Sequence, residues 1–148
     1  MDFLVNWLAS IPAFAVPFAL ATLGLIITEK SGVLNLGVEG MMLMGAISGF
    51  AITAFTFNPW LGVLGAAAGG AISSMLFAVL VLQLNSNQVA TGLALSIFGT
   101  GLSSLIGNAF TGRIVPQFGS IFPAALAKDP IWQLIFGYSP LVYFALAM

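Results

Sequence analysis

Four long apolar runs, separated by short polar links, constrain the fold of this chain more than any other feature of its sequence. The 148 residues carry only three basic and four acidic side chains, whereas ordinary globular proteins are about 25% charged. A helix needs about 20 mostly apolar residues to cross the roughly 30 Å hydrocarbon core of a bilayer. Runs of that length lie at about residues 4–27, 38–57, 60–84 and 87–110. The sequence therefore predicts an all-α, polytopic membrane helical bundle with four complete spans.

The chain changes character after the fourth run. Prolines and polar residues interrupt the segment 111–139, which predicts an extramembrane loop with one or two short interfacial helices. The residues from Leu141 onward are apolar again, but the eight residues up to 148 are too few to cross a bilayer. We therefore expect an incomplete fifth span. On this interpretation residues 1–148 form a single transmembrane domain, the N-terminal part of a longer protein.

Small residues recur at helical spacing within the second, third and fourth runs. Such faces let helix backbones approach closely, which favours helix packing where lipid removes the hydrophobic driving force. The same spacing is also compatible with a face that lines a substrate cavity or contacts a second protomer. The residues expected to pack helices are Gly45, Gly49, Gly65, Gly69, Gly92, Ser96, Gly99, Ser103 and Gly107.

The composition argues against catalysis by this chain. It contains neither cysteine nor histidine, so thiolates, imidazole bases and most zinc or haem ligands are missing. No glycine-rich loop followed by lysine is present to bind nucleotide phosphates. The sequence also has no basic patch. We therefore expect no enzymatic activity, no metal, no cofactor bound by this chain and no nucleic-acid partner.

A first polar constellation lies between the first two runs, at residues 28–40. Gly32 is expected to end the first helix, and Glu39 to lie in the first turn of the next, where a carboxylate complements the helix dipole. An interfacial turn would explain both residues. The link at 33–38, however, is mostly apolar, which favours backbone that dips into the membrane and is shielded by protein or by a water-filled cavity. Interrupted segments of this kind often build transporter sites, so Asn35 and Glu39 are candidate substrate-pathway residues.

A second constellation, at residues 85–92, opens the fourth run. Ser86 or Asn87 can cap the fourth helix by accepting a hydrogen bond from a backbone N–H. Asn87, Gln88 and Thr91 place amides and a hydroxyl in the first turn. Such groups can bind the edge of a sugar or a nucleobase without any charge, and they can equally bond a neighbouring helix. These three residues are further candidates for a substrate pathway.

Two stretches resemble a known family. The residues ITEKSGVLNLGVEGMML at 27–43 and NQVATGLA at 87–94 resemble segments of the inner-membrane permeases of ATP-binding-cassette (ABC) importers. The similarity is to the branch that takes up simple sugars and nucleosides, which is related to the branched-chain amino acid permeases. Family members are about twice this length, and a segment that docks on the ATPase follows the span that begins here at Leu141.

The resemblance implies a permease subunit that forms the pathway for a simple sugar or nucleoside. Its implied partners are an ABC ATPase subunit that binds the ATP, a second permease subunit of the same or a different kind, a periplasmic or lipid-anchored substrate-binding protein, and membrane lipid. The implied location is the bacterial inner (plasma) membrane. An ion-coupled secondary transporter or channel, with Glu29 and Glu39 as coupling groups, remains the alternative hypothesis.

Overall fold

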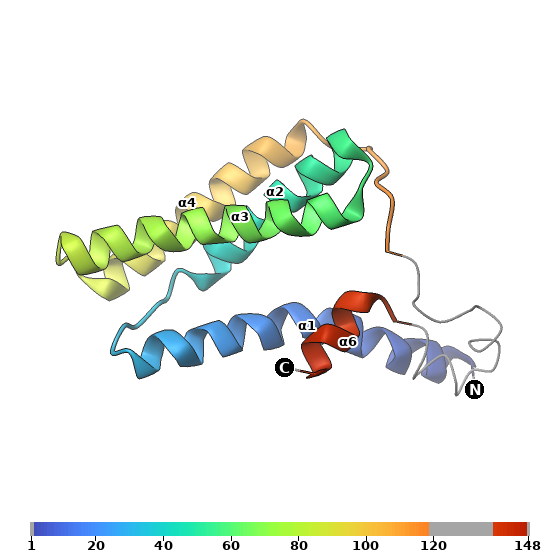
Figure 1. Cartoon of the computed structure of the whole chain (residues 1–148), viewed down its shortest axis with the longest axis horizontal. Helices are drawn as coiled ribbons and strands as arrows, with labels where there is room; N and C mark the ends of the chain where they lie inside the picture. Colours follow the sequence, from blue (N-terminus) through green and yellow to red (C-terminus); the bar gives the residue numbers. More distant parts are fainter. Residues whose placement is uncertain (1, 119–137, 148) are drawn as a thin grey trace. The chain divides into compact units, whose positions relative to one another are not determined.

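The computed structural model describes residues 2–118 and 138–147, and these residues form helices and no strand. The predicted all-α membrane fold is confirmed, because four of the helices are long and apolar enough to cross a membrane. The elements are α1 (Asp2–Lys30), α2 (Val38–Thr56), α3 (Pro59–Ala78), the π-helical turn η1 (Val79–Gln83), α4 (Gln88–Asn108) and α6 (Pro140–Ala147) (Figure 1). The candidate spans are Ser10–Lys30, Val38–Thr56, Pro59–Gln83 and Gln88–Asn108.

The chain divides into two compact units. One contains Met1–Gly24 and Phe118–Met148, and the other contains Leu25–Gln117. A single transmembrane domain over residues 1–148 therefore stays a prediction. In the first unit, α1 runs through both Pro12 and Pro17. Helix α6 begins at Pro140, next to the expected start of a fifth span at Leu141; that this span is incomplete stays a prediction. The interfacial helices expected within 111–139 lie mostly outside the described residues, and residues 111–118 contain no helix.

Local side-chain chemistry explains where the helices of the second unit begin and end. Asn58 caps α3, because its Oδ1 accepts a hydrogen bond from the backbone N of Trp60 at 3.0 Å. Pro59 follows at the first helical position, where its missing N–H costs nothing. Phe57, which ends α2, lies in the left-handed region at φ 54°. These residues make the tight turn that sets α2 and α3 antiparallel.

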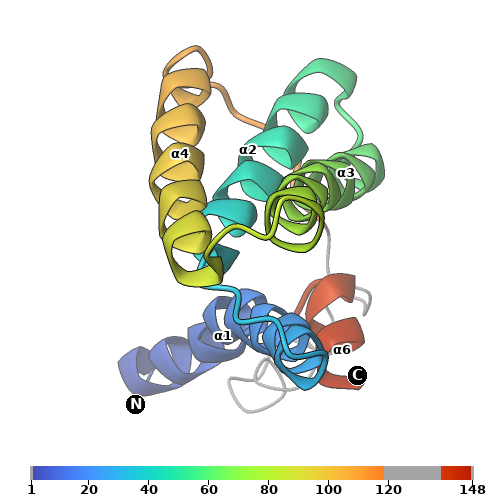
Figure 2. The same cartoon turned by 90° about the vertical axis from the view of Figure 1, so that its left-hand side faces the viewer.

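Helix α2 lies between α3 and α4 in the second unit (Figure 2). Glycines bring it close to α3. A Cβ on Gly49 would lie 2.9 Å from the carbonyl oxygen of Gly62 and equally close to the Cβ of Ala66, and a Cβ on Gly45 would lie 3.1 Å from the carbonyl oxygen of Ala66. Because real Cβ atoms essentially never come within 3.0 Å of another heavy atom, the α2–α3 distance is compatible only with a glycine at position 49.

The contact between α2 and α4 is closer still, because backbone meets backbone. A Cβ on Gly99 would lie 2.6 Å from the Cα of Gly40, and a Cβ on Gly40 would lie 2.7 Å from the Cα of Ser96. Further along α4, the same test places only the side chain of Ile47 near Gly107, at 3.7 Å. The two helices therefore touch most tightly near the middle of α4, at Ser96 and Gly99.

A small apolar cluster sits beside this contact. It consists of Met41 from α2, Phe77 from α3, Val81 from η1 and Leu95 from α4, with Val33 packed against it. Each of the first four side chains is less than 9% exposed. Helices α2, α3 and α4, the turn η1 and the link that precedes α2 therefore meet at the end of the second unit where α2 and α4 begin.

Alanine substitutions on α4 test the close approach. Gly99→Ala should destabilise the protein by about 1–3 kcal/mol, because its new methyl group has to push the α2 backbone away. Gly101→Ala is the matched control on the same helix, since nothing lies within 4 Å of its added Cβ, and it should change stability by about 0.5 kcal/mol or less. Thermal unfolding of the two purified variants in one detergent measures both. Equal unfolding temperatures would contradict the described α2–α4 contact.

Candidate functional site

The candidate site is built around the crossover, defined here as residues 31–37 between α1 and α2. Gly32 adopts φ 80°, a left-handed conformation that glycine adopts without strain, and the N of Val33 closes the end of α1 by donating to the carbonyl of Thr28 at 3.1 Å. The backbone then leaves helical geometry until α2 starts at Val38. Its amide and carbonyl groups consequently need partners from outside a helix.

Asn35 organises the second half of the crossover. The side chain is 8% exposed, and its Oδ1 accepts a hydrogen bond from the N of Gly37 at 2.9 Å. Its Nδ2 lies 3.5 Å from the Sδ of Met41, which also receives the hydroxyl of Ser74 from α3 at 3.4 Å. Asparagine bonding the backbone two residues ahead is a turn-forming interaction. The amide of Asn35 is thus engaged with the protein on both sides.

Side chains of α4 supply partners for the crossover backbone. The N of Leu34 donates to Oε1 of Gln88 at 2.7 Å, and the hydroxyl of Ser96 donates to the carbonyl of Leu36 at 3.0 Å. Gly92 lies between these two residues on α4, and a Cβ there would come within 2.9 Å of the N of Leu36. Two hydrogen bonds and one glycine contact therefore hold the crossover against α4.

The two motif segments at 27–43 and 87–94 are consequently in direct contact. The apolar link was expected to be shielded by protein or by a water-filled cavity, and the structure provides protein groups from α4 at two of its backbone positions. Unpaired backbone groups are strongly disfavoured in a membrane. This arrangement allows a non-helical segment to lie between membrane-length helices.

The candidate pathway residues occupy different environments. Asn35 is buried in the crossover, whereas Glu39 is exposed in the first turn of α2. Asn87, and not Ser86, caps α4, because its Oδ1 accepts from the N of Ala90 at 3.1 Å. The structure brings Asn35 and Gln88 to the same short segment of backbone. A substrate role for these residues stays a prediction.

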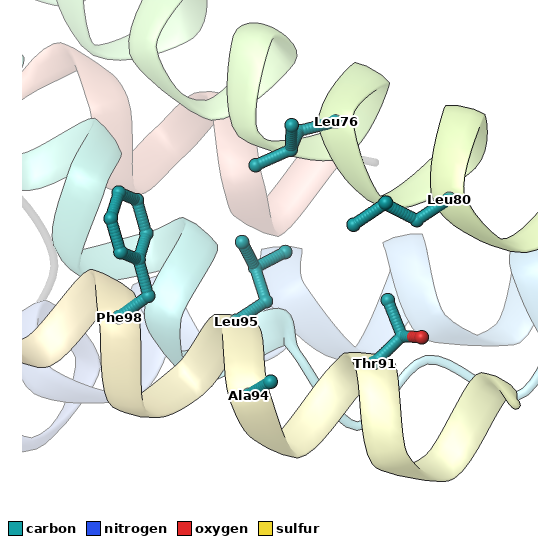
Figure 3. A pocket seen from close by; sticks show the side chains of 6 residues that line it. All are labelled: Leu76, Leu80, Thr91, Ala94, Leu95 and Phe98. Carbon is teal, nitrogen blue, oxygen red and sulfur yellow. The ribbon is translucent and has the colours of Figure 1, made fainter. Parts of the chain in front are cut away.

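Thr91 lines a pocket of about 280 Å³ between α3 and α4. Figure 3 shows Thr91, Leu95 and Phe98 rising from α4 toward the opposite wall. The other lining residues escaped the sequence prediction, although positions 91, 94, 95 and 98 repeat at the helical spacing of one face. The complete lining is Leu76, Leu80, Thr91, Ala94, Leu95 and Phe98.

The described residues offer no group of three or more acidic, histidine or cysteine side chains that could hold a metal ion. Acidic residues lie at both ends of the crossover, since Glu29 is in the last turn of α1 and Glu39 in the first turn of α2, and both are exposed. The chemistry that the described site offers is therefore that of amides, hydroxyls and backbone groups.

Comparison with known proteins places these features in a family. The family described as branched-chain amino acid transport system / permease component matches residues 7–148. A putative glucose ABC transporter permease protein of Haloferax volcanii is 44% identical over 119 residues, which are 80% of this chain and 36% of that protein. A guanosine ABC transporter permease protein of Bacillus subtilis is 31% identical over 134 residues, covering 83% of this chain and 42% of that protein.

A third relative, a nucleoside ABC transporter permease protein of Lactococcus lactis subsp. cremoris, is 28% identical over 108 residues. These residues are 69% of this chain and 34% of that protein. The matched part thus spans between 34% and 42% of the length of these three relatives. No solved structure matches the chain with significance.

Substitution of Gln88 tests the attachment of the crossover to α4. Gln88→Leu removes the acceptor for the N of Leu34 and should cost about 1 kcal/mol of stability. The exchange of the Leu34 amide with deuterium should become faster. Gln88→Glu keeps an acceptor oxygen at the same position and should preserve slow exchange.

Gln83→Leu is the matched control, since Gln83 is exposed in η1 at the same end of the unit. Amide exchange measured by mass spectrometry distinguishes the variants. The described hydrogen bond would be wrong if Gln88→Leu and Gln83→Leu had the same effect on the exchange of Leu34.

Proposed function

We propose that this chain forms part of the membrane pathway of an ABC importer for a simple sugar or nucleoside. The premise is that the chain belongs to the family of branched-chain amino acid transport system permease components. The observation that carries this proposal is the family match over residues 7–148. The three relatives described above have ABC transporter permease in their names, with glucose, guanosine or nucleoside as the stated solute.

The geometry supports a pathway component that does no chemistry itself. The helices of the second unit pack through glycine contacts, and the crossover is held by neutral side chains. Hydroxyls and amides suit an uncharged solute with many hydrogen-bonding groups, since they can exchange bonds with it as it moves. A pathway of this kind needs its energy from a partner.

The proposed partners follow from the same premise. A separate ATPase subunit binds and hydrolyses the ATP, a second permease subunit completes the pathway, and a periplasmic or lipid-anchored binding protein delivers the solute. The chain itself needs no cofactor. Its proposed location is the bacterial inner (plasma) membrane, as a multi-pass protein surrounded by lipid. The relatives support this proposal over ion coupling through Glu29 and Glu39.

Reconstitution tests the proposal. The complete protein that contains this chain, purified with its ATPase and second permease subunit and placed in liposomes, should take up solute only when ATP is present on the ATPase side. Inactivating the ATPase should abolish uptake, and collapsing ion gradients with ionophores should leave it unchanged. Uptake that continues without the ATPase and stops with the ionophores would favour the ion-coupled alternative.

A further inference from the structure

We propose that Arg113 and the aromatic rings that it covers form a binding site for the headgroup phosphate of an anionic phospholipid. The site lies where α2 and α4 both end, at the opposite end of the second unit from the crossover. Figure 1 shows the chain that leaves α4 at the same end of the unit as the turn between α2 and α3. This inference goes beyond the proposed function, because it does not depend on which solute the permease carries.

A turn after α4 brings the guanidinium of Arg113 back onto α2. Gly112 adopts φ 80°, which glycine does without strain, and the N of Arg113 donates to the carbonyl of Phe110 at 3.1 Å. The Cζ of Arg113 then lies 5.5 Å from the ring centre of Phe110 and 6.0 Å from that of Phe55 on α2. A cation within about 6 Å of an aromatic ring centre is attracted to the face of the ring. Two rings therefore hold the guanidinium in place.

The rings that hold the guanidinium are themselves fixed. Phe110 is 9% exposed, and it meets Phe50 and Phe55 edge to face, with ring centres 5.9 Å and 5.6 Å apart. Such pairs add stability beyond the area that they bury. Because the guanidinium already rests on a fixed surface, it loses little further freedom when a ligand binds, which lowers the entropic cost of binding.

The charge of Arg113 is not offset by the protein around it. Arg113 is the only charged residue between Glu39 and Lys128. Among the described residues its guanidinium takes part in no ion pair and no hydrogen bond. A guanidinium carries five N–H donors arranged as a planar fork. These donors are available to an anion that approaches from outside the described part of the protein.

Neighbouring residues place this cation at the depth of the lipid headgroups. The candidate spans formed by α2 and α4 end at Thr56 and Asn108. Trp60, in the first turn of α3, is 61% exposed, and tryptophans of membrane proteins gather at the level of the headgroups. An arginine near the end of a span extends its charged group to the same level. The guanidinium consequently lies where the phosphates of a bilayer lie.

A phospholipid matches this surface better than a soluble anion or a protein carboxylate does. Large apolar side chains are exposed beside the cation, since Phe55 is 69% and Ile114 93% exposed. Acyl chains can cover these side chains while the phosphate binds the fork of the guanidinium through two oxygens. A lipid with a net negative charge is favoured. The phosphate of phosphatidylcholine is already accompanied by its own choline cation, whereas that of phosphatidylglycerol is not.

Native mass spectrometry of the complete permease with its partners tests the site by counting bound lipids. The complex is stripped of lipid in mild detergent and titrated with phosphatidylglycerol. Arg113→Gln should weaken the binding of one phosphatidylglycerol per copy of this chain by about fivefold, the usual effect of one basic residue at an anionic membrane surface. Lys30→Gln is the matched control, because Lys30 is an exposed cation at the other end of the unit, beside the exposed Glu29. It should leave this binding unchanged.

Further variants identify the contacts. Phe55→Leu removes the exposed ring and should weaken binding by about two- to fivefold. Arg113→Lys keeps the charge without the fork and should restore part of the binding that Arg113→Gln loses. Thermal unfolding with and without phosphatidylglycerol separates lipid binding from the stability that the cation gives to the rings. Added phosphatidylglycerol should raise the unfolding temperature of Arg113→Gln less than that of the wild type.

Each of the following results would overturn the proposal. Equal binding of phosphatidylglycerol by the wild type and Arg113→Gln would leave the guanidinium only the role of holding the ends of α2 and α4 together. Equal binding of phosphatidylglycerol and phosphatidylcholine would exclude recognition of a net negative charge. Competition by an equal concentration of glycerol 1-phosphate would show a site for free phosphate. Loss of the substrate-binding protein from the Arg113→Gln complex, with lipid binding intact, would assign the guanidinium to a protein carboxylate.

Discussion

The backbone-to-backbone approach of α2 and α4 is the constraint on which the rest of the second unit depends. Gly40 and Gly99 leave no room for a side chain between the helices. The approach brings α4 close enough for Gln88 and Ser96 to reach the crossover backbone. If the helices were separated by one methyl group, both hydrogen bonds would lengthen beyond a useful distance. The two hydrogen bonds from α4 to the crossover backbone therefore depend on the close packing of small residues between α2 and α4.

The same constraint defines the pocket. Helix α2 contacts both of its neighbours closely, whereas α3 and α4 make few contacts with each other. The space left between α3 and α4 becomes the pocket lined by Leu76, Phe98 and their neighbours. The π-helical turn η1 widens the chain at this point and contributes Leu80. Single π turns within α-helices often mark functional sites, and here one forms part of the pocket wall.

Much of the fold could be predicted from the sequence, because a membrane-spanning helix is specified by length and composition alone. The predicted fourth run at 87–110 and the observed α4 (Gln88–Asn108) differ by two residues at its end. The π turn within the predicted third run could not be foreseen. In this turn the backbone N of Leu84 donates a hydrogen bond to the carbonyl of Val79, five residues earlier. A hydrophobic pattern does not distinguish this bond from the usual bond to the residue four positions earlier. The segment 111–139 was expected to be an extramembrane loop with one or two short interfacial helices, and most of it lies outside the described residues.

The candidate site could be predicted only as separate pieces. The sequence indicated Asn35 and Gln88 as polar residues in unusual places, but it could not pair Gln88 with Leu34, which lies 54 residues earlier. The roles of Met41 and Ser74 depend on a contact between α2 and α3, so they too escaped prediction. Glu39 remains the residue for which the structure adds least, since it is exposed in a first helical turn.

The central claim is that α4 holds the backbone of the non-helical crossover in place through Gln88 and Ser96. Hydrogen–deuterium exchange of the complete protein in lipid nanodiscs tests it most directly, with residues 33–37 compared with the exposed segment 111–117. The account predicts that the amides of Leu34 and Gly37, whose hydrogens are bonded to Gln88 and Asn35, exchange at least tenfold more slowly than those of the exposed segment. Equal exchange in the two segments would contradict it.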